Sequence, residues 1–174
     1  MKLLMVRHAE PDYILCNERG FIGHGHDLAP LTAKGVEQAE RTALDERLKD
    51  AELIIASPYT RALQTAAILS RVTGIRIVVE MDLREWQPDL TFRYKDYEES
   101  LGYVQDYEKH NGEHPHGKKR KWEQRSVLKK RVITALEKYK GKYEKIIVVS
   151  HGMAMGTVCG PRDINHAEIV ECEI

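Results

Sequence analysis

The chain has no excess of charge of either sign, because 27 lysines and arginines balance 27 aspartates and glutamates. A protein with this balance has no overall attraction for nucleic acid or for an anionic membrane surface. The sequence also has no apolar run of transmembrane length, and its amino-terminal apolar stretch is too short for a signal peptide. We therefore expect neither a nucleic-acid partner nor a membrane partner, and any affinity for an anion must come from a few well-placed arginines.

Cysteine is also scarce. Cys16, Cys159 and Cys172 are odd in number and show no paired spacing. This pattern argues against a disulfide scaffold and predicts reduced thiols with structural roles, as in a cytoplasmic protein. With 42% hydrophobic and 31% charged residues, the 174-residue chain has the composition of a single globular domain, residues 1–174.

Short apolar runs alternate with helical patterns along most of the chain. We expect strands over residues 3–6, 53–56, 75–79, 146–149 and 167–172, and helices over 32–49, 57–73 and 122–139. Thr32 and Ser57 are the predicted N-caps of the first two helices, with Pro58 at the first helical position of the second. This alternation predicts a three-layer α/β/α sandwich with a mostly parallel central sheet.

Residues from about 81 to 121 depart from this alternation. They are rich in Tyr, Glu and Lys, poor in aliphatic side chains, and interrupted by glycine and proline. We expect an inserted, lid-like excursion with one or two short helices, laid over an edge of the sheet.

Two histidines directly follow buried strands. Arg7 and His8 come after the run at residues 3–6, and His151 with Gly152 comes after the run at 146–149. Ligands of open α/β sheets bind at the carboxyl ends of the strands, so these residues are expected to meet there. An arginine binds phosphate bidentately, and a neutral imidazole is a competent nucleophile toward phosphorus. The pairing predicts a site for phosphoryl transfer.

Two further residues complete this chemistry. Arg61 falls in the first turn of the helix expected at 57–73, and helical side chains lean toward the amino terminus, so its guanidinium is expected to reach the same edge. Glu85 lies beside Trp86, and a carboxyl in an apolar setting has a raised pKa that suits a general acid.

The ordered set of motifs resembles the histidine phosphatase superfamily, also called the phosphoglycerate mutase-like family. The motifs that carry the resemblance span nearly the whole chain and occur in the order of the family. They are LMVRHAE at residues 4–10, PLTAKG at 30–35, SPYTRALQTA at 57–66, LRE at 83–85 and VSHG at 149–152.

The resemblance implies a role for each residue. His8 would be the phosphorylated nucleophile, and Glu85 the proton donor that later activates water. Arg7, Arg61 and His151 would form the phosphate pocket, with Gly152 allowing backbone N–H groups to approach the anion. The family needs neither a metal nor an organic cofactor, so none is expected here.

Three positions depart from the family pattern. Ala9 replaces a glycine that usually follows the nucleophilic histidine, and Pro11 replaces a Ser or Thr that often contacts phosphate. The family commonly has an asparagine near the pocket, and this chain has none at the aligned position. Asn17 takes its place if the loop before it is about three or four residues longer than in the family. These departures bear on substrate recognition more than on the chemistry.

Other polar clusters have simpler interpretations. His110, His114 and His116, with Glu113, fit no standard zinc spacing and predict a solvated loop. The basic run at residues 118–121 is expected to be a solvated helix start, or to line the mouth of a pocket for an anionic substrate. The Gly23-His24-Gly25-His26 segment is expected to be a flexible loop near the site.

The best-supported activity is therefore metal-independent hydrolysis of a phosphomonoester, the substrate being a small phosphorylated metabolite or a phosphoprotein. A phosphoglycerate mutase is the first alternative, although the short chain argues against it. A non-catalytic phospho-ligand binding module is the second. The sequence does not identify the substrate. It also leaves the oligomeric state open, although the strand at 167–172 offers an edge for sheet pairing.

Overall fold

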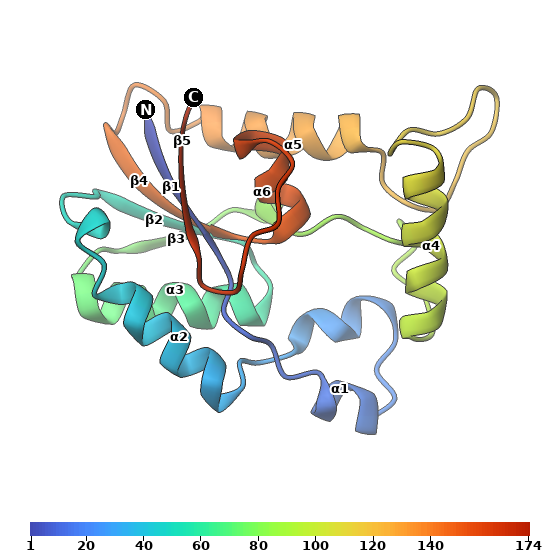
Figure 1. Cartoon of the computed structure of the whole chain (residues 1–174), viewed down its shortest axis with the longest axis horizontal. Helices are drawn as coiled ribbons and strands as arrows, with labels where there is room; N and C mark the ends of the chain where they lie inside the picture. Colours follow the sequence, from blue (N-terminus) through green and yellow to red (C-terminus); the bar gives the residue numbers. More distant parts are fainter.

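The central sheet is parallel except for one edge strand. The computed structural model describes all 174 residues, and its five strands lie in the order β3-β2-β4-β1-β5. Their bounds are β1 Lys2–Arg7, β2 Leu53–Ala56, β3 Ile77–Val79, β4 Lys145–Ser150 and β5 Ile169–Glu173. β1, β2, β3 and β4 pair in parallel, and β5 pairs antiparallel with β1 (Figure 1). The prediction of a mostly parallel sheet is confirmed.

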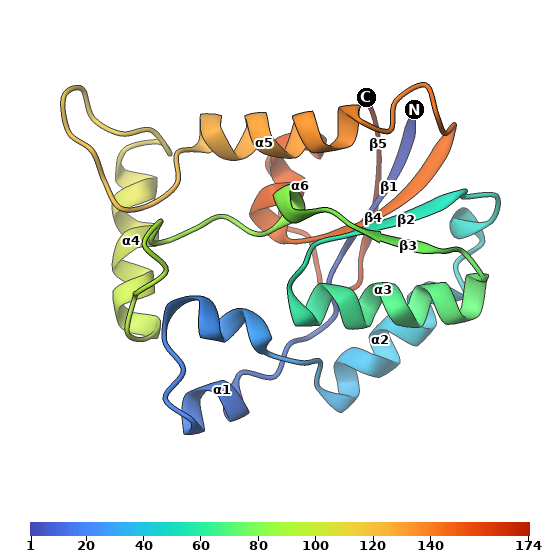
Figure 2. The ribbon, with the colours of Figure 1, turned by 180° about the vertical axis from the view of Figure 1, so that it is seen from behind.

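Helices cover both faces of this sheet. The helices α2 (Ala33–Ala43) and α3 (Thr60–Thr73) pack on one face, and α5 (Arg125–Glu137) and α6 (Gly152–Cys159) on the other (Figures 1 and 2). Side chains alternate along each strand, so that Leu4 of β1 joins the α3 side while Leu3 joins the α5 side. The predicted three-layer arrangement is confirmed.

Four further elements stand beyond the carboxyl ends of the strands. These are α1 (Ile14–Glu18), the 3₁₀ turns η1 (Gly23–Leu28) and η3 (Met81–Leu83), and α4 (Tyr97–Lys109). Figure 1 shows α4 and α1 set apart from the sheet, with the carboxyl edge facing them. The excursion after residue 81 therefore contains one helix of 13 residues, as expected. No helix in the molecule is both long and apolar enough to cross a bilayer.

Several element boundaries differ from the prediction. The second helix begins at Thr60 rather than at residue 57, and its N-cap is Tyr59, so the prediction that Ser57 caps it is wrong. The Ser57 hydroxyl is instead committed to a histidine of the site, described below. The helix expected over 32–49 ends at Ala43, and a separate 3₁₀ turn, η2 (Glu46–Leu48), follows. The N-cap at Thr32 is confirmed, because its side chain accepts a hydrogen bond from the amide of Gly35 at 2.9 Å.

The expectation of three unpaired thiols is also corrected. Cys159 ends α6 and Cys172 lies in β5, and the two form a disulfide with their Cα atoms 5.7 Å apart. This spacing lies in the usual range for a disulfide. It arises because the end of α6 packs beside β5, a contact that sequence spacing does not reveal. Cys16 is buried and free.

Gly35 lies in the first turn of α2 where a second backbone comes very close. A Cβ atom at this position would lie 2.3 Å from the carbonyl oxygen of Glu10. We therefore expect Gly35→Ala to lower the free energy of unfolding by about 1–3 kcal/mol, although alanine is the better helix former. The matched control is Gly102→Ala in α4, where no atom lies within 4 Å of the added Cβ, and we expect it to raise stability by about 0.5–1 kcal/mol. Urea unfolding of both variants measures the contrast, and equal shifts would contradict the steric argument.

Candidate active site

His8 lies at the carboxyl end of β1 with one ring nitrogen occupied. Its Nδ1 is 2.8 Å from the carbonyl oxygen of Ala9, and a carbonyl only accepts, so Nδ1 carries the proton. The Nε2 atom of the neutral ring is therefore left with its lone pair. Burial, with the nearby Arg61 guanidinium, lowers the pKa of His8 from 6.5 to about 3. The side chain is thus a neutral imidazole with a free basic nitrogen at neutral pH.

His151 faces His8 from the start of α6. The two ring centroids are 5.0 Å apart. The His151 Nε2 atom lies 2.7 Å from the hydroxyl of Ser57, which follows β2, while its buried Nδ1 has no partner in the protein. Burial, then the charge of Arg61, holds the pKa of His151 well below its usual value. When Nε2 accepts the Ser57 proton, Nδ1 carries the proton of the neutral ring and is a buried donor without a partner in the protein.

Arg7 and Arg61 bring two guanidinium groups to the same region, that of Arg61 buried and that of Arg7 half-buried. Arg7 donates from Nη1 to the carbonyl of Ile164, and its Nε is buried without a partner. Arg61, the second residue of α3, donates from Nη1 to Asp27 at 3.3 Å, and its Nε is also unpartnered. Both arginines lie close enough to lower the pKa values of His8 and His151. Buried donors are rarely left unpaired, so this group of N–H atoms is suited to an anion.

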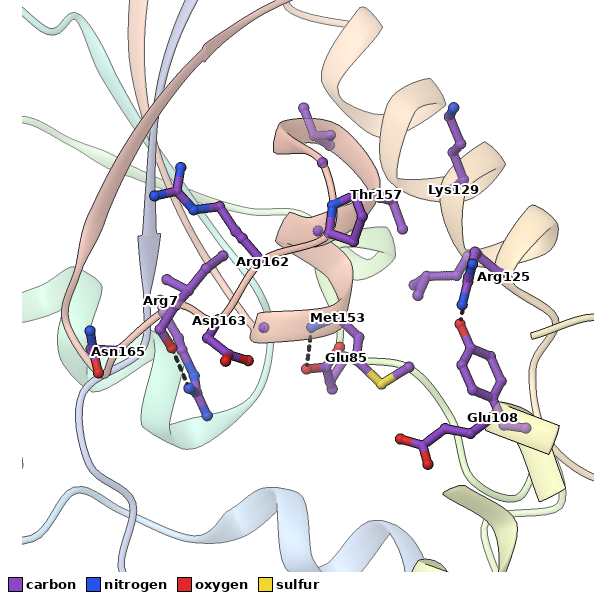
Figure 3. Close-up of a pocket in the computed structure, with 18 residues that line it drawn as sticks. Arg7, Glu85, Glu108, Arg125, Lys129, Met153, Thr157, Arg162, Asp163 and Asn165 are labelled. Carbon is purple, nitrogen blue, oxygen red and sulfur yellow. Dashed lines mark hydrogen bonds between the residues drawn. The ribbon is translucent and has the colours of Figure 1, made fainter. Parts of the chain in front are cut away.

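Glu85 lies across the amino terminus of α6. Its Oε1 accepts hydrogen bonds from the amides of Trp86 (2.7 Å) and Ala154 (3.0 Å), and its Oε2 from Met153 (3.1 Å). Burial raises the pKa of this carboxyl, although the three amides act in the opposite direction. Figure 3 shows the carboxylate beside Met153 at the base of the cleft. A raised pKa and a place at the cleft are what a proton donor requires.

A buried ion pair that the sequence did not suggest holds the Glu85 segment. Arg131 of α5 donates to the carbonyls of Asp82, Arg84 and Glu85 at 2.7–2.9 Å. Its guanidinium is also paired with Glu123, at 2.7 Å from Nε to Oε1. No periodicity singles out Arg131 among the many basic residues of α5, so only the fold identifies it as a positioning residue.

Two pockets meet at Glu85. A wide pocket of about 1290 Å³ is lined by Arg7, Glu85 and Gly152 together with residues of α5 and the 160–165 loop (Figure 3). An aromatic pocket of about 400 Å³ is lined by Arg61, Glu85 and Asn17, with residues of η1 and α4. The two predicted arginines therefore open on different pockets, and Glu85 contributes to both.

The predicted residues are thus brought together. His8, His151, Arg7 and Arg61 lie near one another at the carboxyl edge, with Glu85 in the walls of both pockets and Gly152 in the wall of the wide pocket. Asn17 lies on α1, exposed, at the aromatic pocket, and makes no hydrogen bond to the protein through its side chain.

Several residues of the site had no signal in the sequence. His166 lies with its ring 5.4 Å from that of His8. Asp27 binds Arg61, and Gln87 donates to the hydroxyl of Tyr59, whose ring centroid is 5.1 Å from that of His151. The segment of Gly23 to His26 lies near the site as predicted, but it belongs to the 3₁₀ turn η1 rather than to an irregular loop.

The other polar clusters bind neighbouring residues of the excursion and of the start of α5, away from the site. His114 lies 2.9 Å from the carbonyl of Trp122, and Glu113 accepts from Gln124 and from Ser126. The prediction that residues 118–121 start a helix or line a pocket mouth is wrong, because α5 begins only at Arg125 and the run lines neither pocket. Its Arg120 pairs with Asp106. No three His, Cys, Asp or Glu side chains are grouped so as to hold a metal ion.

The protonation of His8 couples the site to stability. The unfolded chain takes up a proton on His8 near pH 6.5, and the folded chain does so only near pH 3, so the unfolded state binds more protons between these values. Stability is therefore expected to fall as the pH drops through this window, by up to about 5 kcal/mol from His8. Urea unfolding between pH 7 and pH 4 measures the slope. His8→Asn should make the slope shallower, the remainder belonging to groups such as His151 whose pKa is also lowered, and His116→Asn, in an exposed loop, should leave it unchanged; equal slopes in all three proteins would contradict the assignment.

Comparison with known proteins defines the class. The fold is shared with a phosphoglycerate mutase from Thermus thermophilus, with a TM-score of 0.67 at 24% identity, covering 98% of this chain and 92% of that one. The molecule is therefore an α/β protein of the phosphoglycerate mutase-like kind.

The family follows from the sequence. The model of the histidine phosphatase superfamily (branch 1) matches residues 3–161, so the chain belongs to this superfamily, and the predicted family is confirmed. The uncharacterized phosphatase PhoE of Bacillus subtilis strain 168 is 30% identical over 155 residues, covering 87% of this chain and 72% of PhoE. A protein of Hydrogenobacter thermophilus named as phosphoserine phosphatase 2 is 38% identical over 84 residues, 48% of this chain and only 39% of its own length. Relatives named as phosphoglycerate mutase GpmB also match.

Proposed function

We propose that the chain is a metal-independent phosphatase that hydrolyses phosphomonoesters through a phosphohistidine on His8. The observation that carries the proposal is the neutral His8 ring, which donates its Nδ1 proton to the Ala9 carbonyl and leaves Nε2 free, close to the Arg7 and Arg61 guanidinium groups. A nucleophile set among preorganised positive donors is the arrangement that phosphoryl transfer requires.

The first half-reaction transfers the phosphoryl group to the protein. Nε2 of His8 forms a bond to phosphorus as the ester P–O bond breaks, and Glu85 gives its proton to the departing oxygen. Arg7, Arg61 and Nδ1 of His151 bind the phosphate oxygens and neutralise the charge that accumulates on them. The Gly152 turn permits close approach of the backbone at the start of α6, and Asn17 adds a contact from the aromatic pocket.

The second half-reaction releases phosphate. Glu85, now a carboxylate, accepts a proton from water, whose oxygen attacks phosphorus. The P–Nε2 bond breaks, and His8 returns to the neutral form with inorganic phosphate as product. Because every proton transfer uses Glu85, neither a metal ion nor an organic cofactor takes part in this scheme.

The experiment that tests the proposal is hydrolysis of p-nitrophenyl phosphate with EDTA present, followed by phosphate release. In parallel, denatured samples quenched during turnover are examined for phosphate that is labile in acid and stable in base, as expected of phosphohistidine. Turnover in EDTA together with phosphate on His8 supports the proposal. A requirement for a divalent ion, or turnover without a phosphorylated histidine, would contradict it.

Relatives named as phosphoglycerate mutases give the second candidate its support. Such an enzyme shares the first half-reaction and returns the phosphoryl group to the substrate instead of to water. Conversion of 3-phosphoglycerate to its 2-isomer, measured against phosphate release, separates the two activities. Binding of phosphate analogues without either reaction would favour the third candidate, a phospho-ligand binding module.

The setting of the reaction is part of the same proposal. The substrate is a small phosphorylated molecule met in the cytoplasm, and residues 81–121 act as a lid-like insertion within a single domain. Fractionation of cells tests the location: recovery of the chain in the cytosolic fraction supports the proposal, and recovery outside it contradicts the proposal.

A further inference from the structure

The aromatic pocket has an unusual wall for a site that binds phosphate esters. Five of its 14 lining residues are aromatic: Tyr13, Tyr59, Trp86, Tyr94 and Tyr97. Arg61 is the only lysine or arginine among them, whereas Asp27 and Glu85 are both acidic. Apart from Arg61, which is assigned to the phosphate, this pocket offers a substrate flat apolar surfaces and no lysine or arginine.

The rim of the pocket continues this character into solvent. Of the 14 exposed large hydrophobic side chains in the molecule, nine lie within residues 13–28 and 90–101. Both segments contribute lining residues to the aromatic pocket, and two of the nine, Tyr13 and Tyr97, themselves line it. Exposed apolar side chains concentrated around a concave site indicate a surface that contacts a ligand.

The two segments are locked to each other, so the rim is a built structure. The Gly23 amide donates to the carbonyl of Tyr94 at 2.7 Å, and a Cβ at Gly23 would lie 1.9 Å from the carbonyl oxygen of Phe92. The ring of His24 lies 4.9 Å from that of Phe92, and the ring of His26 lies 5.6 Å from that of Tyr94. Only glycine fits between the segments at position 23, where φ is +52°.

Asp27 places a carboxylate beside the phosphate-binding arginine. Its Oδ1 is 3.3 Å from Nη1 of Arg61 and its Oδ2 is 2.8 Å from Nδ1 of His24, and its side chain is 16% exposed. A second anionic group on the substrate would meet this carboxylate at close range. Apart from Arg61, the pocket has no lysine or arginine that could offset the repulsion between the two negative charges. The wide pocket, by contrast, carries Arg125, Lys129 and Arg162.

We infer that the aromatic pocket receives the leaving alcohol, and that the substrate is a small phosphomonoester of a bulky aromatic alcohol with no second anionic group. The inference rests on the proposed function, because it assigns the leaving-group side of that reaction. The aromatic rings stack on the alcohol, and Asp27 discriminates against carboxylates and second phosphates.

Three substrates that all release an alkoxide test this assignment: benzyl phosphate, ethyl phosphate and 3-phosphoglycerate. We expect kcat/KM for benzyl phosphate to exceed that for ethyl phosphate by about ten- to a hundredfold, as burial of a phenyl ring implies. Tyr94→Ala should reduce this ratio, and Lys129→Ala, in the wide pocket, should not. Asp27→Asn should raise kcat/KM for 3-phosphoglycerate relative to benzyl phosphate by about tenfold. Ratios are compared because the loss of the Asp27–Arg61 contact affects every substrate alike.

Each outcome separates this inference from the proposed function. Hydrolysis with 3-phosphoglycerate or ethyl phosphate preferred leaves the phosphatase intact and overturns the aromatic leaving group. A change of preference in Lys129→Ala and not in Tyr94→Ala moves the leaving group to the wide pocket. A phosphotyrosine peptide preferred over phenyl phosphate by more than tenfold assigns the rim to a protein partner.

If no ester is hydrolysed, the proposed function fails, and binding still tests the pocket. The probes are 2-phenylethylphosphonate and propylphosphonate, which replace the ester oxygen of benzyl and ethyl phosphate with carbon. Tighter calorimetric binding of the phenylethyl compound, lost in Tyr94→Ala, supports the inference. Equal binding of the two phosphonates overturns it.

Discussion

We expect His8→Ala to lower kcat for phosphomonoester hydrolysis by about a thousandfold or more, because it removes the atom that attacks phosphorus. The remaining site retains Arg7, Arg61 and His151, so inorganic phosphate should still bind. Loss of turnover with retained phosphate binding is the signature of a missing nucleophile. The assay is release of phosphate from p-nitrophenyl phosphate at saturating substrate.

Two controls make this result specific. His116→Ala, in an exposed loop remote from both pockets, should leave kcat unchanged. His8→Gly assayed with added imidazole tests for rescue, since free imidazole would supply the missing ring nitrogen and leave as phosphoimidazole. Turnover of His8→Ala within tenfold of the wild type would show that the phosphoryl group is not passed to His8.

Glu85→Gln is expected to lower kcat/KM for alkyl phosphates by about a hundred- to ten-thousandfold. An alkoxide is a poor leaving group that needs a proton, whereas p-nitrophenolate leaves readily without one. The loss should therefore be much smaller for p-nitrophenyl phosphate. That difference between substrates reports proton donation and would not arise from simple misfolding.

The pH profile gives Glu85 a second test. The reaction of alkyl phosphates needs the protonated carboxyl, so its rate should be highest below the raised pKa of Glu85 and fall as the pH rises through it. This falling limb should be absent from Glu85→Gln. The glutamine amide would face one of the N–H groups that Glu85 now accepts from, so thermal unfolding is measured in parallel. A falling limb that persists in the variant assigns it to another group.

The sequence predicted best those regions in which a single local pattern determines the secondary structure. The strands that end at Arg7 and Ser150 are apolar runs with no competing pattern, and both lie where expected. The chemistry could be predicted because His8 and His151 directly follow those strands. A strand end has a fixed place in a parallel sheet, so proximity in space follows from position in the chain.

The features that were missed depend on tertiary contacts. The eight residues of α6 include two glycines, a threonine and a valine, so the sequence has a weak helical signal there. The helix forms because it packs on α5 and because its first amides bind Glu85. Ser57 and Pro58 resemble a helix start, but the Ser57 hydroxyl is bound to His151 and the helix begins three residues later. Asp27 binds Arg61, which lies 34 positions away in the sequence, and Arg131 binds the carbonyl of Glu85, which lies 46 positions away. No local pattern reveals such partners.

The position of β1 in the sheet has a consequence for biosynthesis. This strand pairs on one side with β4, from Lys2↔Lys145 to Arg7↔Ser150, and on the other with β5 near the carboxyl end. His8 is thus made long before His151, the ring that faces it. A growing chain has to keep the apolar β1 strand unpaired until β4 has left the ribosome, which favours slow folding and exposes the strand to chaperones. The same order means that no product of translation that ends before His151 carries an assembled phosphate pocket.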